Sequence, residues 1–201
     1  MKTLRALIVG IAFVSMQAAA NAAGLTIVTA TAQQVNCAFE VDCTFTVASG
    51  QTNFAVPGAL GTAQLQQRTF TAKLGQTLRH GYEFKLDLSQ LVTLSDSTCF
   101  TGLEIDFGPI VKLQYNNTGP VDDVFQIVAA GEILLGSATQ TDGVIAFTFQ
   151  QLVCAGDGVI RGKSTVLFGM ASASAPKLSS AKVFTTTADT LTVRAMLPAH
   201  H

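Results

Sequence analysis

The residues best suited to hold a ligand lie in one short stretch of the chain, residues 116–123. It reads Asn-Asn-Thr-Gly-Pro-Val-Asp-Asp and joins two apolar segments. Calcium takes six to eight oxygen ligands, and carboxylates and amides supply them. We therefore name Asn116, Asn117, Asp122 and Asp123 as candidate ligands, with Asn116, Asp122 and Asp123 as the calcium set. The alternative is an ordinary turn, because these residue types form turns anyway and the spacing departs from D-x-D-x-D-G.

A second group of acids has the spacing for acid–base chemistry. Glu104 and Asp106 stand two apart in an alternating segment, so they share one face of the expected strand. Glu83 and Asp87 are four apart and share a face of a second expected strand, and the two strands as neighbours could bring these acids to the same face. Carboxylates about 5–10 Å apart can hydrolyse glycosides. The simpler interpretation is the solvated face that every amphipathic strand has, and we favour it.

The histidines give little support to catalysis or metal binding. His80 stands alone before a glycine, where a turn or surface position is expected, and His200 and His201 end the chain. The sequence has neither a C-x-x-C pair nor a G-x-S-x-G elbow. We predict no catalytic residues and no cofactor apart from the calcium candidate.

The N-terminus has the pattern of an export signal. Lys2 and Arg5 precede a short apolar run, and small residues follow up to Ala20-Asn-Ala22. This order predicts a signal peptide over residues 1–22, bacterial in style, and a single domain over residues 23–201. The apolar run is too short for a membrane anchor. We expect a periplasmic or extracellular protein without a membrane span after cleavage.

Four cysteines in an exported chain indicate two disulfides, for which three pairings exist. We favour Cys37–Cys43, which closes a short loop, and Cys99–Cys154, which brackets the clearest strands. Free thiols in a reducing compartment would conflict with the export signal.

Charge excludes two classes of partner. Without residues 1–22 the chain keeps 10 basic and 13 acidic residues, a net charge of −3. Such a balance offers no electrostatic footprint for nucleic acid or anionic lipid.

Hydropathy alternates with a period of two along much of the chain, which predicts an all-β fold. Residues 82–88 are the most regular case, with Tyr82, Phe84, Leu86 and Leu88 on one face. Further strands are expected at residues 25–30, 43–47, 53–56, 65–71, 103–107, 110–115, 123–128, 132–135, 144–149, 164–168, 182–185 and 190–197, with a loop at 171–176 and no long amphipathic helix. This number of short strands predicts a disulfide-stapled antiparallel β-sandwich, with a jelly roll as one arrangement that fits.

The leading functional hypothesis is a non-enzymatic structural or adhesive role at a cell surface or outside the cell. In composition the chain is similar to fimbrial subunits, being exported, rich in Thr, Ala, Gly and Val, and only 12% charged. That similarity implies self-association or binding to another surface by strand addition at an open sheet edge. The alternatives are a module for carbohydrate or calcium acting through residues 116–123, and a secreted hydrolase using Glu104 and Asp106.

Overall fold

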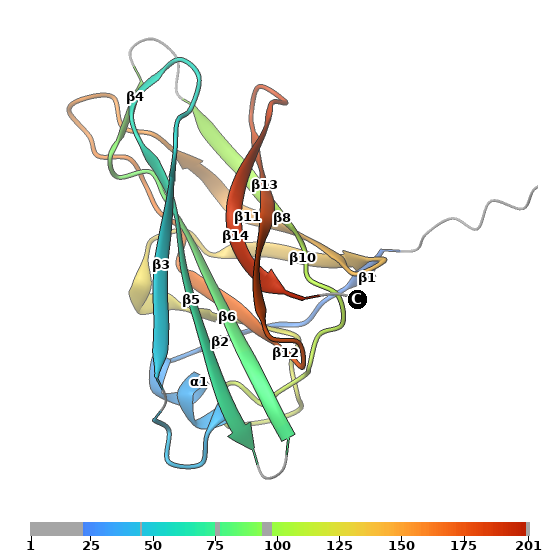
Figure 1. Cartoon of the computed structure of the whole chain (residues 1–201). Coiled ribbons are helices and arrows are strands. Elements are labelled where there is room, and N and C mark those ends of the chain that lie inside the picture. The colour runs from blue at the N-terminus through green and yellow to red at the C-terminus, as the bar shows by residue number, and fades with distance from the viewer. Residues whose placement is uncertain (1–21, 45, 75–76, 94–97, 200–201) are drawn as a thin grey trace, which may run out of the picture.

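The computed structural model describes residues 22–199 apart from 45, 75–76 and 94–97 (Figure 1). The predicted signal peptide lies outside these residues except for Ala22. None of the helices in the described part of the chain has the length and apolar character needed to cross a membrane.

Two six-stranded sheets make up most of the fold. The first has the order β1 (Ala23–Gly24), β10 (Leu135–Thr141), β11 (Val144–Cys154), β8 (Cys99–Asp106), β13 (Pro176–Thr185) and β14 (Thr190–Pro198). The second has the order β2 (Ile27–Ala30), β9 (Val124–Ile127), β12 (Leu167–Ser172), β6 (Thr77–Asp87), β5 (Ala63–Leu74) and β3 (Val47–Phe54). Strands β4 (Ala59–Gly61) and β7 (Leu91–Thr93) form a small separate sheet. Within the described residues β2 and β9 pair in parallel, and the other ladders are antiparallel.

The main core lies between the two sheets. The predicted stripe on β6 points into it, so that Tyr82, Phe84 and Leu86 are almost fully buried. From the other sheet Phe147 reaches Phe168 with ring centroids 5.0 Å apart. Burial of each such side chain stabilises the fold by about 1.5–3 kcal/mol. The predicted all-β sandwich is therefore confirmed.

A second, smaller core covers part of the outer face of the β2–β3 sheet. Helix α1 (Ala32–Phe39) lies there and buries Val35 and Phe39. Phe39 meets Phe70 of β5 edge to face, with centroids 4.6 Å apart. The sequence prediction did not include this helix. Two turns are too short for a clear 3.6-residue period, so the available signal was the capping box of Thr31 and Gln34.

The segment 110–115 is also not the strand that alternation predicted. It forms isolated bridges, Val111 with Ala171 and Leu113 with Asp122. Its apolar residues Leu113 and Tyr115 pack into the second core beside α1 rather than into a sheet. Alternating hydropathy indicates only that one side of a segment is buried. A segment that crosses over the face of a sheet buries one side just as a strand does, so the pattern does not distinguish the two.

Some predicted boundaries were wrong by several residues. The strand expected at 43–47 begins instead at Val47, because Cys43 has a positive φ of 60° and ends a turn. The strand expected at 132–135 begins at Leu135. The loop expected at 171–176 is shorter than predicted, because β12 extends to Ser172 and β13 begins at Pro176.

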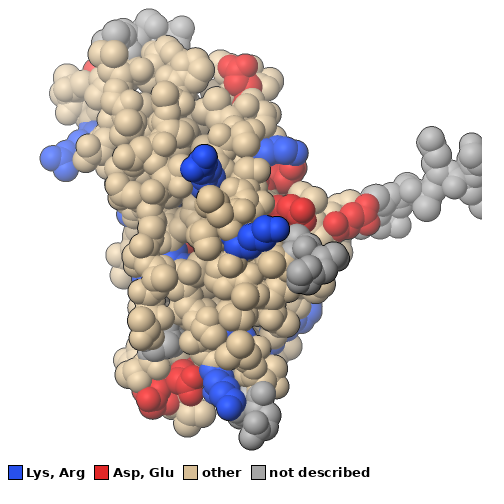
Figure 2. Space-filling view, in the orientation of Figure 1, with Lys and Arg blue, Asp and Glu red and all other residues tan. Residues whose placement is uncertain are grey.

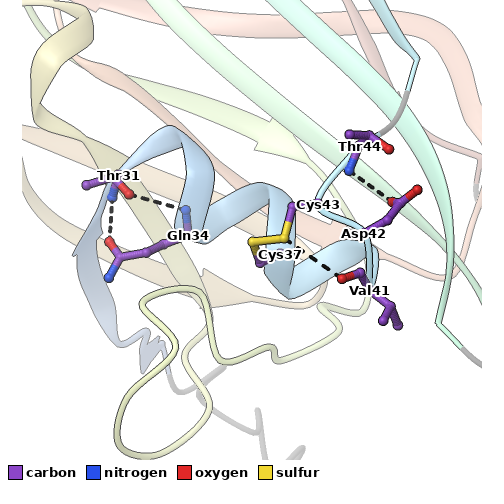
Figure 3. The surroundings of a disulfide bond; sticks show 7 residues. All are labelled: Thr31, Gln34, Cys37, Val41, Asp42, Cys43 and Thr44. Atoms are coloured by element: carbon purple, nitrogen blue, oxygen red, sulfur yellow. Dashed lines mark hydrogen bonds between the residues drawn. A yellow bond between two sulfur atoms is a disulfide. The ribbon is translucent and has the colours of Figure 1, made fainter.

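Both predicted disulfides are present. Cys99 and Cys154 are directly opposed on β8 and β11, so this bridge joins two central strands. Cys37 in α1 bonds to Cys43 in the turn that follows it (Figure 3). Asp42 closes this turn by accepting a hydrogen bond from the Thr44 amide at 3.1 Å. The second bridge therefore fixes the exit of the chain from α1 toward β3.

Candidate functional site

The two sides of the sandwich differ in how the edge strands of the two sheets are connected. On one side β1 and β2 are the edge strands, and the chain runs directly from one sheet into the other between them. On the other side the edges are β3 and β14, which lie side by side (Figure 1). We call this second side the open side.

Strand β3 presents an unprotected edge on the open side. It pairs with β5 without a bulge from Val47, opposite Phe70, to Phe54, opposite Ala63. Its eight residues include neither a charged residue nor a proline, and most are exposed. Exposed edges are usually shielded by charge, proline, bulges or shortness, and β3 has none of these. Figure 2 shows mostly uncharged side chains in the region of β3, with a few basic side chains nearer the centre of the view.

The neighbouring edge of β14 is capped from inside the protein. Gln67 of β5 donates its side-chain amide to the Arg194 carbonyl at 3.0 Å. Its carbonyl oxygen accepts a hydrogen bond from the Met196 amide at 2.6 Å. One amide side chain thus satisfies a donor and an acceptor of β14, as a neighbouring strand would.

A groove of about 310 Å³ lies between the two edges, lined among others by Gly50, Thr52, Gln67 and Met196. Gln67 holds one carbonyl and one amide of the β14 edge, whereas no side chain caps the β3 edge in this way within the described residues. The sequence alone did not predict this edge strand, because residues 48–52 lack the aromatic and β-branched residues typical of a strand.

A second hollow, of about 520 Å³, lies on the outer face of the same sheet next to β3. Ser49, Gln51, Gln66, Arg68 and Leu167 line it. Arg68 Nε lies 3.1 Å from Oε2 of Glu83, whose side chain is 2% exposed. Burial raises the pKa of Glu83 to about 7, although the positive charge of Arg68 acts to lower it.

The predicted ligand Asp123 has protein partners in the structure. Its Oδ2 accepts hydrogen bonds from the backbone amide and hydroxyl of Thr26, at 3.0 and 2.9 Å. Its Oδ1 lies 2.9 Å from Nζ of Lys112. Burial alone would raise the pKa of Asp123, but the bonds from Lys112 and Thr26 outweigh it and lower the pKa. Asp123 therefore anchors β2 to β9.

The other predicted ligands are held in the loop that packs beside α1. Asn116 accepts from the Thr118 amide through Oδ1, and its carbonyl accepts from Gln34 of α1. Asn117 has a positive φ of 59°. Burial and the neighbouring Asp123 raise the pKa of Asp122. Among the described residues no three His, Cys, Asp or Glu side chains gather as metal ligands. Calcium binding stays a prediction.

The expected grouping of four acids is wrong. Glu104 and Asp106 lie on β8 of the first sheet, where Glu104 contacts Lys182 at 2.7 Å. Glu83 and Asp87 lie on β6 of the other sheet. Since both pairs point away from the shared core, the whole thickness of the sandwich separates them.

His80 was expected at a turn or surface, and that expectation is also wrong. It lies within β6, is 5% exposed, and its Nδ1 is 2.8 Å from the Thr71 hydroxyl. Burial lowers its pKa, which favours the neutral ring. His200 and His201 lie outside the described residues.

No protein-family model matches the chain, and no curated protein or solved structure gives a match. The residues themselves must therefore carry any functional argument.

Proposed function

We propose that this chain is an exported, non-enzymatic protein with a structural or adhesive role, acting in the periplasm or outside the cell. The observation that carries the proposal is the β3 edge, which is eight residues long, exposed and uncharged. An unpaired strand of this kind is a template on which another chain can add a strand.

Two further features support association through β3. Gln67 occupies two backbone groups in the middle of the β14 edge, which favours β3 as the edge that pairs. The lack of charge on β3 also means that two copies can pair with each other without opposing like charges. Both disulfides suit an oxidising compartment, which agrees with export.

The proposal is tested by sedimentation velocity of the oxidised chain, residues 23–201, over a range of protein concentrations. The expected result is reversible, concentration-dependent formation of dimers or larger species. A monomer at every concentration would contradict self-association.

A charge placed on the edge strand provides the matched variant. Thr52→Lys puts a positive charge on the inward side of β3, where a natural edge strand often carries one. We expect it to be monomeric. Gln150→Lys introduces the same charge at an exposed position of β11, an interior strand, and should associate as the unmodified chain does.

A further inference from the structure

The edge strand β3 has a fixed inward and outward side, which limits how another strand can pair with it. Val47 packs against the second core on the outer face of the sheet, whereas Phe54 packs against the main core between the sheets. Since no bulge interrupts the strand, its odd-numbered residues face outward and its even-numbered residues face inward. The outward side therefore consists chiefly of Ser49, Gln51 and Asn53.

The inward side of β3 is hollow at Gly50. This glycine lies opposite Gln67, whose side chain reaches across to β14. A Cβ on Gly50 would meet no other atom within 4 Å, and the groove of about 310 Å³ between β3 and β14 includes this space. A side chain from an added strand can enter the groove, because both strands that border it are edge strands.

A second copy of β3 fits this edge in an antiparallel register. Antiparallel pairing about a two-fold axis keeps the outward sides of both copies on one face of the joint sheet, and it brings one residue opposite its own copy. The pairing covers residues 47–53 when the axis lies at Gly50, or residues 48–54 when it lies at Gln51. With the axis at Gly50 the two glycines meet and the hollow stays empty. With the axis at Gln51, Thr52 of the second copy lies opposite Gly50 and places its side chain at the hollow, as close packing favours.

The outward side of β3 supports the axis at Gln51. This residue would face its own copy, and a side-chain amide both donates and accepts hydrogen bonds, so two of them are complementary. Ser49 would face Asn53 of the second copy, a pair of polar side chains that can also share a hydrogen bond. None of the residues of β3 is charged, so the paired strands oppose no like charges.

We propose that β3 pairs with β3 of a second copy of this chain, antiparallel and with the two-fold axis at Gln51. The two sheets that end in β3 (Figure 1) then form one continuous sheet across the dimer. The inference rests on the proposed strand addition and names its partner. The dimer is closed, because each copy uses its β3 edge to cover the β3 edge of the other. The expected assembly is therefore a dimer rather than a fibre.

Cysteine cross-linking of the oxidised chain, residues 23–201, locates the axis. Ser49→Cys, Gln51→Cys and Asn53→Cys each place one thiol on the exposed outward side of β3. Directly opposed residues of an antiparallel pair have Cα atoms about 4.5–5.5 Å apart, which a disulfide can span. Under mild oxidation Gln51→Cys should form a covalent dimer at least about tenfold faster than the other two variants. An equimolar mixture of Ser49→Cys and Asn53→Cys should cross-link faster than either variant alone.

Gln150→Cys, at an exposed position of β11, measures cross-linking by random collision. Peptide mapping of each covalent dimer shows which positions are joined. Preferential joining of position 49 to position 51 would place the axis at Gly50 and contradict the register. Equal rates in all variants, with Gln150→Cys among them, would overturn the two-fold pair.

Charge variants at the axis test the same register without a new thiol. Gln51→Glu and Gln51→Lys each place like charges opposite one another, so each should weaken the dimer by about fivefold. An equimolar mixture of the two should recover the affinity, because opposite charges then meet. The same substitutions at Ser49 face an uncharged Asn53 and should show no recovery on mixing. Absence of recovery in the Gln51 mixture would contradict the axis.

Sedimentation velocity separates this inference from the proposed function. With rising concentration the sedimentation coefficient of the unmodified chain should level off at that of a dimer. Larger species, or association without preferential cross-linking at position 51, would overturn the closed dimer and leave strand addition standing. A monomer at every concentration would overturn both, and would point to a strand of a different protein as the occupant of the β3 edge.

Discussion

At the residue scale, Glu83 makes the stability of the protein depend on pH. Its pKa is raised from 4.5 to about 7 in the folded protein, chiefly by burial. Between these values the folded protein keeps a proton that the unfolded chain releases. The contribution of Glu83 to the free energy of unfolding is therefore most favourable below about pH 4.5. It falls as the pH rises to 7, by about 3 kcal/mol for a shift of this size.

Urea unfolding of the unmodified chain and Glu83→Gln at several pH values measures this contribution. A glutamine side chain does not titrate, so the free energy of unfolding of the variant should not fall in this way as the pH rises. Toward pH 8 the variant should therefore be stabilised relative to the unmodified chain. Glu104→Gln, which removes a half-buried ion-pair carboxylate from the other sheet, is the matched control variant. Parallel profiles for the unmodified chain and Glu83→Gln would show that Glu83 titrates normally.

Substitutions at the neighbouring residues Asp123 and Asp122 should differ in how much they lower the free energy of unfolding. Asp123→Asn weakens the bonds to Lys112 and both bonds to Thr26, so we expect a loss of about 2 kcal/mol in the free energy of unfolding. Because its folded pKa is lowered, this stabilisation is present above pH 3.8 and is lost as the pH falls further. Asp122→Asn should cost little, since burial already raises its pKa.

The same pair of positions tests the calcium prediction. Melting temperatures are compared in calcium and in chelator. A calcium site at residues 116–123 requires a rise with calcium that Asp122→Ala abolishes. An unchanged melting temperature would contradict calcium binding at this loop, and Asp123 would keep its role as an anchor.

Residue roles divide into those that local sequence reveals and those that it does not. The disulfide pairs and the buried stripe of β6 followed from cysteine spacing and alternation. The role of Asp123 did not, because its partner Thr26 is 97 positions away. Glu83 looked like an ordinary outward acid, since alternation gives the face of a strand and does not show what covers that face.

At the scale of elements, Gln67 separates an open edge from a closed one. Gln67→Met keeps the size of the side chain but removes both hydrogen bonds to β14, leaving the Met196 amide and the Arg194 carbonyl without their partner. We expect the free energy of unfolding to fall by about 1–3 kcal/mol and association to increase. Urea titration and sedimentation measure the two effects, and an unchanged association state would show that β14 is not an available edge.

The elements that sequence reasoning missed share a physical cause. Helix α1 is two turns long and is fixed by its packing on Phe70 and by the Cys37–Cys43 bridge. The segment 110–115 alternates like a strand because it packs one side onto α1 and the sheet. In both cases tertiary contacts decided the local structure, and local periodicity carries no information on them.

At the scale of the whole molecule, the two disulfides should differ in their contribution to stability. Cys99 and Cys154 are 55 positions apart, whereas Cys37 and Cys43 are 6 apart. In the chain-entropy treatment the longer loop contributes about 4 kcal/mol and the shorter about 2 kcal/mol. Urea unfolding of the two paired Cys→Ser variants tests this order, and a larger loss from the Cys37/Cys43 variant would contradict it.

We propose that the open side of the sandwich associates through β3. The most direct measurement is amide hydrogen exchange of residues 47–54 in dilute and in concentrated oxidised protein. We predict that the β3 amides that face away from β5 exchange fast in dilute protein and become protected in concentrated protein, while the amides of β11, already paired on both sides, do not change. Equal exchange of β3 at both concentrations would contradict strand addition and, with it, the proposed structural role.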